Sequence, residues 1–350
     1  MWQDITYTNQ VGAALDHALA STCCNRVFAI TDQNTSRLVL PRLGSERLHG
    51  ATLVTLPAGD EHKTLPSLQQ VWQALSDGGA TRQSMVVNVG GGMVTDLGGM
   101  AAATFKRGIS FINVPTTLLG AVDAAAGGKT GINFNGLKNE IGVFAAASHV
   151  IISTCYFDTL PRQELRSGYA EMIKHAMLDG HEAFADTLSH EPTAEDPDTL
   201  LQLLEASTAV KQRIVSQDPT EQGVRRALNL GHTIGHALES LAMKKGRPVP
   251  HGYAVAWGLV AETILSHLLL GFPSADLQRL AQYVREHYGT PGVTCDDYPS
   301  LLELMRHDKK SRHGEINCTL LRQLGQPSLD HAIGDEDINT ALDIARDYLD

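Results

Sequence analysis

The 350-residue sequence has few cysteines, no internal repeat and no long hydrophobic run. Its cysteines are odd in number, irregularly spaced and without a CxxC pair; they are Cys23, Cys24, Cys155, Cys295 and Cys318. Such spacing favours reduced thiols over a disulfide framework or a thiolate zinc site. No uninterrupted apolar run reaches about 18 residues, and the N-terminus, MWQDITYTNQ, lacks the pattern of a signal peptide. We therefore expect a cytoplasmic protein without a membrane anchor.

Positive charge is also in short supply. Lys and Arg number 28 against 39 Asp and Glu, which gives a formal net charge of -11 at pH 7. An acidic chain is a poor general nucleic-acid binder, although a local basic pocket can still receive a small anion. With 43% hydrophobic and 19% charged residues, the chain can bury a large core, and its length fits two domains or one large domain.

Short β-rich runs alternate with helical runs in the first part of the chain. The pattern predicts strands at 26–32, 51–57, 85–92, 109–115 and 149–153, and a helix at 65–75. A mostly parallel sheet with helices on both faces suits this rhythm. From 161 to 350 nearly every segment has amphipathic helical spacing, apart from a β-like run at 316–321. We predict an α/β domain over residues 1–160 and a mostly α-helical domain over residues 161–350.

Two glycine-rich segments lie in the first domain. VGGGMVTD (Val89–Asp96) follows a predicted strand and precedes a predicted helix, where glycines let a phosphate approach backbone N–H groups. It is not GxGxxG, and a tight strand-to-helix turn is the simpler alternative. Residues 115–144 contain GGKTG, but Asp123 occupies the first glycine position of a P-loop, which argues against a Walker A site. The lysines and threonines of this segment favour an anion pocket.

The segment RRALNLGHTIGHALE sets His232 and His236 four residues apart, so that both imidazoles share a helix face with the preceding asparagine. A hydrogen-bonded pair and a metal site both fit that spacing. His251 opens the next segment, and Glu171 lies upstream with Lys174 one turn on, a spacing that also suits a simple ion pair. Two histidines and one carboxylate would leave a zinc ion with an open coordination position, as catalytic sites do.

Several longer motifs occur in one order along the chain: GGGMVTDLGG, PTTLLGAVDAAAGGKTGIN, LKNEIG, AEMIK, RxxLNxGHTxxHA, HG and HDKK. In this combination, from about Asp32 to about Lys310, the sequence resembles the 3-dehydroquinate synthase family. The resemblance implies a Rossmann-like NAD-binding α/β domain, a helical domain that binds Zn2+ or Co2+, and a homodimer. It also implies conversion of a phosphorylated sugar acid, 3-deoxy-D-arabino-heptulosonate 7-phosphate, into 3-dehydroquinate and phosphate in the shikimate pathway, with NAD regenerated in each turnover.

The same resemblance assigns roles to single residues. The metal ligands would be Glu171, His232 and His251. The phosphate contacts would be Lys129, Asn139, Asn229, His236, Lys309 or Lys310, and Arg107 from a neighbouring subunit. The remaining active-site residues would be Lys211 and Arg225 on the substrate carboxylate, the lysines Lys138 and Lys174, and Asp123 between nicotinamide and substrate. His236 would also transfer protons.

The NAD contacts that the resemblance implies are Asp32, Asp60, Lys63, Gly90, Gly91, Gly92, Asp96, Thr116, Thr117 and Thr159, together with Lys129 and Lys138. The family usually has glutamate where this chain has Asp60, so Glu61 is an alternative contact. Taken singly, Lys211, Lys309 and Lys310 fit solvated charges on helices, and Arg107 fits a surface residue. Only their register with the other motifs favours a role in binding.

Three other functions suit parts of this pattern. A cyclase of another pathway would share the motifs, but Lys211, Arg225, Asn229 and His236 match the dehydroquinate type. A metal-dependent alcohol or glycerol dehydrogenase has a related fold, would release NADH and would not need so many phosphate-binding cations. A non-catalytic NAD-binding regulator would not need intact metal ligands.

Overall fold

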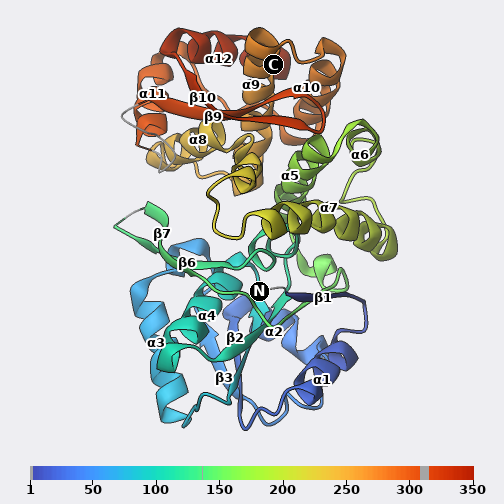
Figure 1. Ribbon diagram of the computed structural model, residues 1–350, viewed down its shortest axis with the longest axis vertical. Coiled ribbons are helices and arrows are strands. Elements are labelled where there is room, and N and C mark those ends of the chain that lie inside the picture. Colours follow the sequence, from blue (N-terminus) through green and yellow to red (C-terminus); the bar gives the residue numbers. More distant parts are fainter. Residues whose placement is uncertain (1–2, 136, 308–314) are drawn as a thin grey trace. The chain divides into compact units, whose positions relative to one another are not determined.

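The computed structural model describes residues 3–135, 137–307 and 315–350. The chain forms two compact units (Figure 1). The first comprises Met1–Pro161 with Asp196–Thr208, and the second comprises Arg162–Glu195 with Ala209–Asp350. The first unit therefore ends one residue beyond the predicted boundary. It also includes the beginning of helix α7 (Pro197–Gln217), which the sequence analysis assigned to the second domain.

The first unit is built on a six-stranded parallel sheet with the order β1-β8-β5-β4-β2-β3. Its strands are β1 (Asp4–Tyr7), β2 (Val27–Asp32), β3 (Thr52–Leu56), β4 (Met85–Gly90), β5 (Ser110–Pro115) and β8 (His149–Ile152). All but β1 coincide with predicted runs. Every residue of β4 is buried, as expected of a central strand covered on both faces. This sheet confirms the predicted α/β class.

Helices α1 (Val11–Ser21), α2 (Gln33–Leu38), α3 (Leu65–Asp77) and α4 (Gly92–Thr104) connect the strands, as Figure 1 shows. Leu15 and Leu19 of α1 pack with Val87 and Ile112 of the sheet in one apolar cluster. Helix α4 lies so close to β4 that a Cβ on Gly98 would overlap the Asn88 side chain. The glycine is therefore required for this helix–strand contact. Single helical turns occupy Leu40–Arg42, Asp60–His62, Phe105–Arg107, Gly120–Ala124 and Phe157–Thr159.

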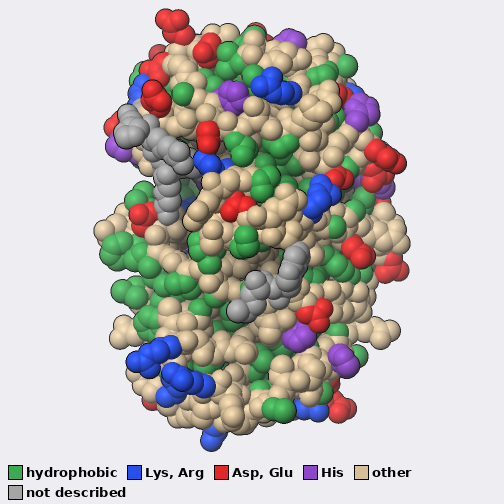
Figure 2. Space-filling view, viewed as in Figure 1, with side chains coloured by type: hydrophobic (Ala, Val, Ile, Leu, Met, Phe, Trp, Pro, Cys, Tyr) green, Lys and Arg blue, Asp and Glu red, His purple; other side chains and the backbone are tan. Residues whose placement is uncertain are grey.

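A separate antiparallel hairpin, β6 (Lys129–Phe134) and β7 (Leu137–Phe144), completes the first unit. This hairpin was not predicted, because its glycines and polar residues interrupt any regular alternation of polar and apolar side chains. All eight residues of β7 are exposed, and apolar side chains are prominent on this part of the surface (Figure 2). The exposed apolar side chains are Phe134, Leu137, Ile141, Val143 and Phe144.

The second unit is mostly helical, as predicted. Its helices are α5 (Arg162–Asp179), α6 (His181–Thr187), the end of α7, α8 (His232–Lys244), α9 (His251–Leu270), α10 (Ser274–Tyr288), α11 (Tyr298–Arg306) and α12 (Asp335–Leu349), with single turns at Val224–Asn229 and Cys295–Asp297. Strand β9 (Ile316–Gln323) contains the predicted β-like run. Its antiparallel partner β10 (Gln326–Ile333) lies where helical spacing was expected. Gly325, with φ 78°, makes the tight turn that this pairing requires.

Helix α9 is the central helix of the second unit and packs against α5, α8, α10, α12 and β9. Its length and apolar composition would suffice to cross a membrane. However, 72% of its most apolar stretch is buried inside the protein, so α9 is accounted for as a core helix.

Candidate functional site

The residues predicted to contact NAD follow the carboxyl ends of the parallel strands. Asp32 ends β2, Asp60 and Lys63 follow β3, Gly90 ends β4, Thr116 and Thr117 follow β5, and Thr159 follows β8. In a parallel sheet the carboxyl ends of all the strands lie at the same end of the sheet. The strand order reverses between β2 and β4, since β3 extends the sheet on one side and β5 and β8 on the other. Open α/β sheets bind ligands outside the carboxyl ends at such a switch point.

The glycine run forms the turn between β4 and α4. Gly91 caps the helix without a side-chain hydrogen bond. A Cβ on Gly91 would lie 3.0 Å from Thr117 Cγ2, and a Cβ on Gly120 would lie 3.2 Å from the Gly92 nitrogen. The turn thus leaves no room for side chains around the first N–H groups of α4. Backbone N–H groups at a helix N-terminus bind phosphate, so these residues fit the pyrophosphate of a dinucleotide.

Asp32 has a structural role that the sequence analysis did not foresee. Its carboxylate accepts hydrogen bonds from the backbone N–H groups of Asn34 (2.8 Å) and Thr35 (2.9 Å) and from Thr35 Oγ1 (3.1 Å). It is therefore the N-cap of α2. A ribose contact by the same carboxylate stays a prediction.

A polar network joins predicted NAD residues to predicted substrate residues. The buried Lys63 ammonium forms an ion pair with Asp96 and donates a hydrogen bond to Asn139 Oδ1. Lys138 Nζ lies 3.5 Å from Asp60 Oδ2. These five residues, drawn from β7, α4 and the turn after β3, are thus brought together within the first unit.

Asn133 of β6 lies in the same network and was missed by sequence reasoning. Its backbone N–H donates to the Lys63 carbonyl (2.7 Å), and its Nδ2 donates to the Asp60 carbonyl (3.0 Å). Its Oδ1 accepts from the Asn139 backbone N–H (2.9 Å). One side chain therefore connects the turn after β3 to β7. No local motif signals this role, because the partners are distant in sequence.

The other predicted substrate residues of the first unit lie on turns and at a strand end. Arg107 is exposed in a turn where it and Lys106 both have left-handed φ values, 68° and 49°. Asp123 belongs to the short turn Gly120–Ala124, and Lys129 begins β6. Lys309 and Lys310 lie outside the described residues.

The second unit brings the predicted metal ligands together. Glu171 of α5 is completely buried, and its Oε1 lies 3.2 Å from His232 Nε2 and 3.5 Å from His251 Nε2. Lys174, one turn along α5, forms an ion pair with the other carboxylate oxygen. One oxygen of Glu171 thus faces His232 and His251, and the other faces Lys174.

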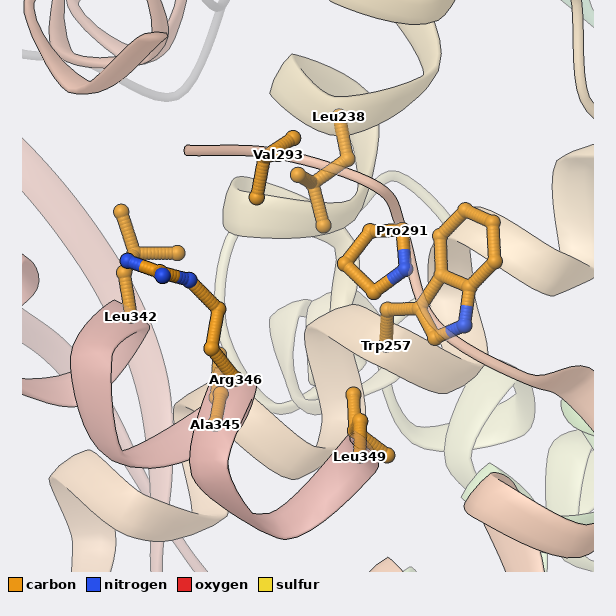
Figure 3. Close-up of a pocket in the computed structure, with 9 residues that line it drawn as sticks. Leu238, Trp257, Pro291, Val293, Leu342, Ala345, Arg346 and Leu349 are labelled. Atoms are coloured by element: carbon orange, nitrogen blue, oxygen red, sulfur yellow. The ribbon is translucent and has the colours of Figure 1, made fainter. Parts of the chain in front are cut away.

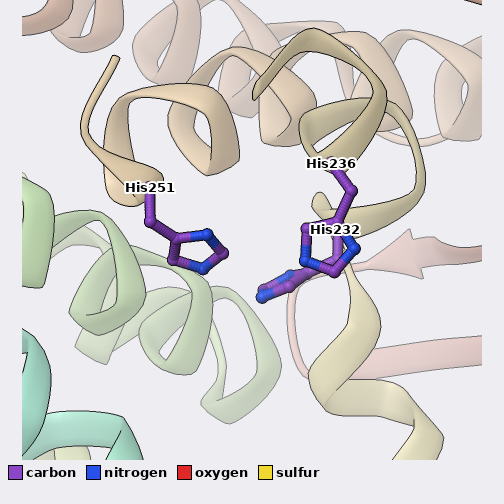
Figure 4. A group of neighbouring side chains, drawn as sticks. All are labelled: His232, His236 and His251. Atoms are coloured by element: carbon purple, nitrogen blue, oxygen red, sulfur yellow. The ribbon is translucent and has the colours of Figure 1, made fainter. Parts of the chain in front are cut away.

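His236 lies beside the two predicted histidine ligands (Figure 4). His232 and His236 extend from α8 and His251 from the start of α9, and the three rings point toward one another. The ring centroids are 5.2 Å apart for His232 and His236, 5.6 Å for His232 and His251, and 5.7 Å for His236 and His251. One ring nitrogen from each lies within 4.8 Å of those of the other two.

The imidazoles of His232 and His251 are held from behind by acceptors. His232 Nδ1 lies 3.0 Å from the Leu230 carbonyl, and His251 Nδ1 lies 3.1 Å from Glu239 Oε2. Each ring therefore presents Nε2 toward Glu171. Metal-binding histidines use their second nitrogen in this way, which fixes the tautomer and the ring orientation. Glu239 was not among the predicted site residues.

The electrostatics of this cluster favour an ionised Glu171, the form in which a carboxylate binds a divalent cation. Burial opposes ionisation of Glu171, but Lys174 and His232 hold the pKa of its carboxyl well below the usual range. Burial also disfavours the protonated form of His251, yet hydrogen bonds to Glu171 and Glu239 raise the pKa of His251 to about 10. Tetrahedral bonds of about 2.1 Å to zinc place neighbouring donor atoms about 3.4 Å apart. The two Glu171 distances, 3.2 and 3.5 Å, match that spacing.

The remaining predicted residues of the second unit are buried or partly buried. Arg225 donates from Nη1 to the Pro219 carbonyl (2.6 Å), and Lys211 is buried on α7. Asn229 does not share a helix face with the histidines, as the sequence analysis expected. It ends a separate turn, and Gly231, with φ 78°, breaks the chain direction before α8 begins. The left-handed glycine is the physical reason for the difference.

An apolar cavity lies elsewhere in the second unit (Figure 3). Leu238, Trp257, Pro291 and Leu342 line it, with Arg346 at its edge. Arg346 donates to Cys295 Sγ at 3.1 Å. Apart from Arg346 the lining is apolar, and it includes none of the residues of the histidine cluster described above.

Comparison with known proteins identifies the family of the chain. The 3-dehydroquinate synthase N-terminal family model matches residues 53–167, and the C-terminal model matches residues 168–311. The chain is 46% identical over 346 residues to a 3-dehydroquinate synthase of Parabacteroides distasonis, covering 99% of this chain and 98% of that protein. The chain belongs to the 3-dehydroquinate synthase family. Glu171, His232, His236 and His251 lie within the match to the C-terminal model of this family.

Solved structures with the same fold include two other synthases. A 2-deoxy-scyllo-inosose synthase complexed with carbaglucose-6-phosphate, NAD+ and Co2+ has a TM-score of 0.85 at 22% identity, covering 98% of this chain and 96% of that one. The 2-epi-5-epi-valiolone synthase of Streptomyces hygroscopicus, with NAD+ and Zn2+ bound, has a TM-score of 0.85 at 24% identity, covering 99% and 97%. At these identities the likeness shows the fold alone.

Proposed function

We propose that the chain converts 3-deoxy-D-arabino-heptulosonate 7-phosphate into 3-dehydroquinate and phosphate, with NAD and Zn2+ or Co2+ as cofactors. The convergence of Glu171, His232 and His251 carries the proposal, in a chain 46% identical to a 3-dehydroquinate synthase over nearly its full length. Two fold relatives bind NAD+ with Co2+ or Zn2+, which supports the choice of cofactors.

NAD would bind at the carboxyl edge of the parallel sheet. The N-terminus of α4 would receive the pyrophosphate, because the glycine run leaves its N–H groups accessible. Asp32 and Asp60 end or follow neighbouring strands and would contact the riboses. Lys63, held between Asp96 and Asn139, would fix the turn after β3 relative to β7, beside the bound NAD.

Glu171, His232 and His251 would hold the cation, and the fourth position would remain for substrate. When bound, the cation supplies Lewis-acid polarisation of substrate oxygens. His236 lies beside these ligands, with its ring centroid 5.2 Å from that of His232 and 5.7 Å from that of His251. An imidazole there is suited to moving a proton to or from the substrate near neutral pH.

The cationic residues would bind the two anionic ends of the substrate. Lysine and asparagine side chains would hold the phosphate: Lys129, Asn139, Asn229 and one of Lys309 and Lys310, with His236. Arg225 and Lys211 would hold the carboxylate, and the planar guanidinium can form two parallel bonds to it. Holding both ends in one conformation is expected to supply much of the rate.

The decisive experiment follows phosphate and NADH together. We expect the purified protein, with cation and substoichiometric NAD, to release many phosphates per NAD and to accumulate no NADH. Net NADH from a simple alcohol would instead identify a dehydrogenase. Equal turnover of a heptulose phosphate that lacks the carboxylate would identify another cyclase. NAD binding without turnover by cation-loaded protein would identify a non-catalytic regulator.

We further propose a cytoplasmic homodimer in which Arg107 reaches the phosphate bound by the partner. Its exposed turn, with two consecutive left-handed residues, projects the side chain from the first unit's surface. Mixing inactive Arg107→Ala chains with inactive His232→Ala chains should then restore part of the activity. No recovery after demonstrated subunit exchange would refute the shared site.

A further inference from the structure

Helix α8 begins with a metal-ligand histidine but has no capping side chain of its own. Its N-cap is Gly231, in the left-handed region, and makes no side-chain hydrogen bond. The first residues of a helix carry backbone N–H groups that lack intrahelical partners. For α8 these groups lie in the interior of the second unit, where water cannot satisfy them, because Gly231, His232, Thr233 and Ile234 are all buried.

Glu262 of α9 supplies the missing acceptors. Its Oε2 accepts from the Gly231 N–H at 2.6 Å, and its Oε1 accepts from the Ile234 N–H at 3.0 Å. The side chain is completely buried. Within α9, Glu262 is the single residue among Asp, Glu, Lys and Arg. A buried carboxylate in an otherwise apolar helix needs such partners, and the helix dipole favours negative charge at this position.

Glycines bring the two helices close enough for this contact. A Cβ on Gly231 would lie 2.7 Å from the Leu259 side chain, and a Cβ on Gly235 would lie 2.9 Å from the Ala254 carbonyl. A Cβ on Gly258 would overlap the Gly231 carbonyl. The backbones of α8 and α9 therefore touch, and the Glu262 side chain is long enough to reach the first turn of α8.

We propose that Glu262 is a positioning residue for the cation site of the proposed function. Its two oxygens hold the residues on either side of His232, and hence the first turn of α8, against α9. That turn fixes His232 Nε2 beside Glu171 and places His236 next to His251. Because α9 also carries His251, one carboxylate holds both histidine-bearing helices in register.

The test separates positioning from simple stabilisation by measuring Co2+ and Zn2+ binding to full-length, chelator-stripped protein. Glu262→Gln keeps the size of the side chain but turns an amide N–H2 toward a backbone N–H. We expect its Co2+ affinity to fall about 10- to 100-fold, as for other groups that orient metal ligands. We also expect a changed visible absorption spectrum of bound Co2+ and a lower Tm.

Ser266→Ala is the matched control. Ser266 lies one turn along α9, is equally buried, and connects the Glu262 carbonyl to the Leu321 N–H at 2.7 and 3.0 Å. Its loss should lower Tm while leaving Co2+ affinity and the spectrum unchanged. If both variants lower Tm and neither alters Co2+ binding, Glu262 is only a structural cap and the proposal is wrong.

Glu262→Asp covers the case in which Glu262→Gln does not fold. It keeps the charge but is one methylene shorter, so it should hold one of the two N–H groups and give an intermediate Co2+ affinity. Wild-type affinity and spectrum in Glu262→Asp would overturn the proposal. Failure of the wild-type protein to bind Zn2+ or Co2+ would instead refute the proposed function itself.

Discussion

Replacing Glu239 by glutamine is the most direct perturbation of the cation site that leaves every proposed ligand in place. Glu239 lies on α8 and is buried, and its Oε2 is 3.1 Å from His251 Nδ1. Glutamine has nearly the same shape and can still accept a hydrogen bond through its carbonyl. The substitution therefore removes the negative charge behind His251 without opening a cavity.

The magnitude follows from the change in hydrogen-bond type. A hydrogen bond to a charged group contributes about 1.5–3 kcal/mol, and a neutral one about 0.5–1.5 kcal/mol. The difference, about 1–1.5 kcal/mol, corresponds to roughly a 5- to 15-fold change in an equilibrium constant. We therefore expect Glu239→Gln to weaken Zn2+ and Co2+ binding about tenfold, because the His251 imidazole becomes less basic and so a weaker cation ligand.

The assay is competition for the cation against a chelator of known affinity, together with kcat/KM at saturating cation. Asp276→Asn is the control, because Asp276 Oδ1 also faces an imidazole, His181 Nδ1 at 3.6 Å, outside the histidine cluster. It should leave cation affinity unchanged. Wild-type affinity in Glu239→Gln, measured on folded protein, would show that His251 is not a cation ligand held by this carboxylate.

Three further outcomes are expected. Treatment with a chelator should abolish turnover and added Zn2+ or Co2+ should restore it, whereas full activity in demonstrably metal-free protein would contradict the cation site. Arg225→Lys should lower kcat/KM for the heptulosonate phosphate tenfold or more, because lysine cannot reproduce the bidentate contact. This corresponds to a loss of at least about 1.4 kcal/mol of transition-state stabilisation, with cation content unchanged. Unchanged kinetics would refute the assignment of Arg225 to the substrate carboxylate. Asn133→Ala should weaken NAD binding in titrations and raise the substrate KM, because the turn after β3 and strand β7 lose the side chain that connects them. The control is Asn25→Ala, which removes surface contacts to Thr81 and Ser84 and should change neither quantity. Loss of thermal stability alone in Asn133→Ala would show that the anchor is only structural.

The parallel sheet could be predicted because its strands carry their own signal. β2 and β4 are short apolar runs that end in polar or glycine residues, and burial on both faces requires that composition. The glycine turn after β4 was also predictable, because a run of glycines between a strand and a helix is typical of a tight strand-to-helix turn. Strand β1 gave no comparable signal, because half of its four residues are exposed at the sheet edge.

The hairpin of β6 and β7 and strand β10 show what the sequence could not predict. β7 is exposed along its whole length, so no hydrophobic alternation marks it as a strand. β10 is mostly exposed or partly buried and contains Asp330 with φ 58°, at a register irregularity. In both cases pairing with a neighbouring strand outweighs weak local preference.

The histidine cluster was half predictable. The spacing of His232 and His236 is a local property of a helix and was visible in the sequence. The acceptors that orient or position these residues are not local. Glu239 reaches His251 across 12 positions, and Glu262 reaches Gly231 across 31. These contacts arise because α8 packs against α9, and that packing is seen only in the folded unit.

Helix α9 illustrates how composition alone misleads. By length and apolar content it would suit a bilayer, yet its apolar residues are required because it packs against four helices and a strand of the second unit. Its single carboxylate would be costly in hydrocarbon, but here Glu262 meets two backbone donors that have no acceptor in their own helix. The apolar surroundings strengthen that contact, because no water competes for the donors and the local dielectric is low. A hydrophobic core helix is therefore a suitable support for a cation site, since it makes a single buried charge effective in holding His232 in place.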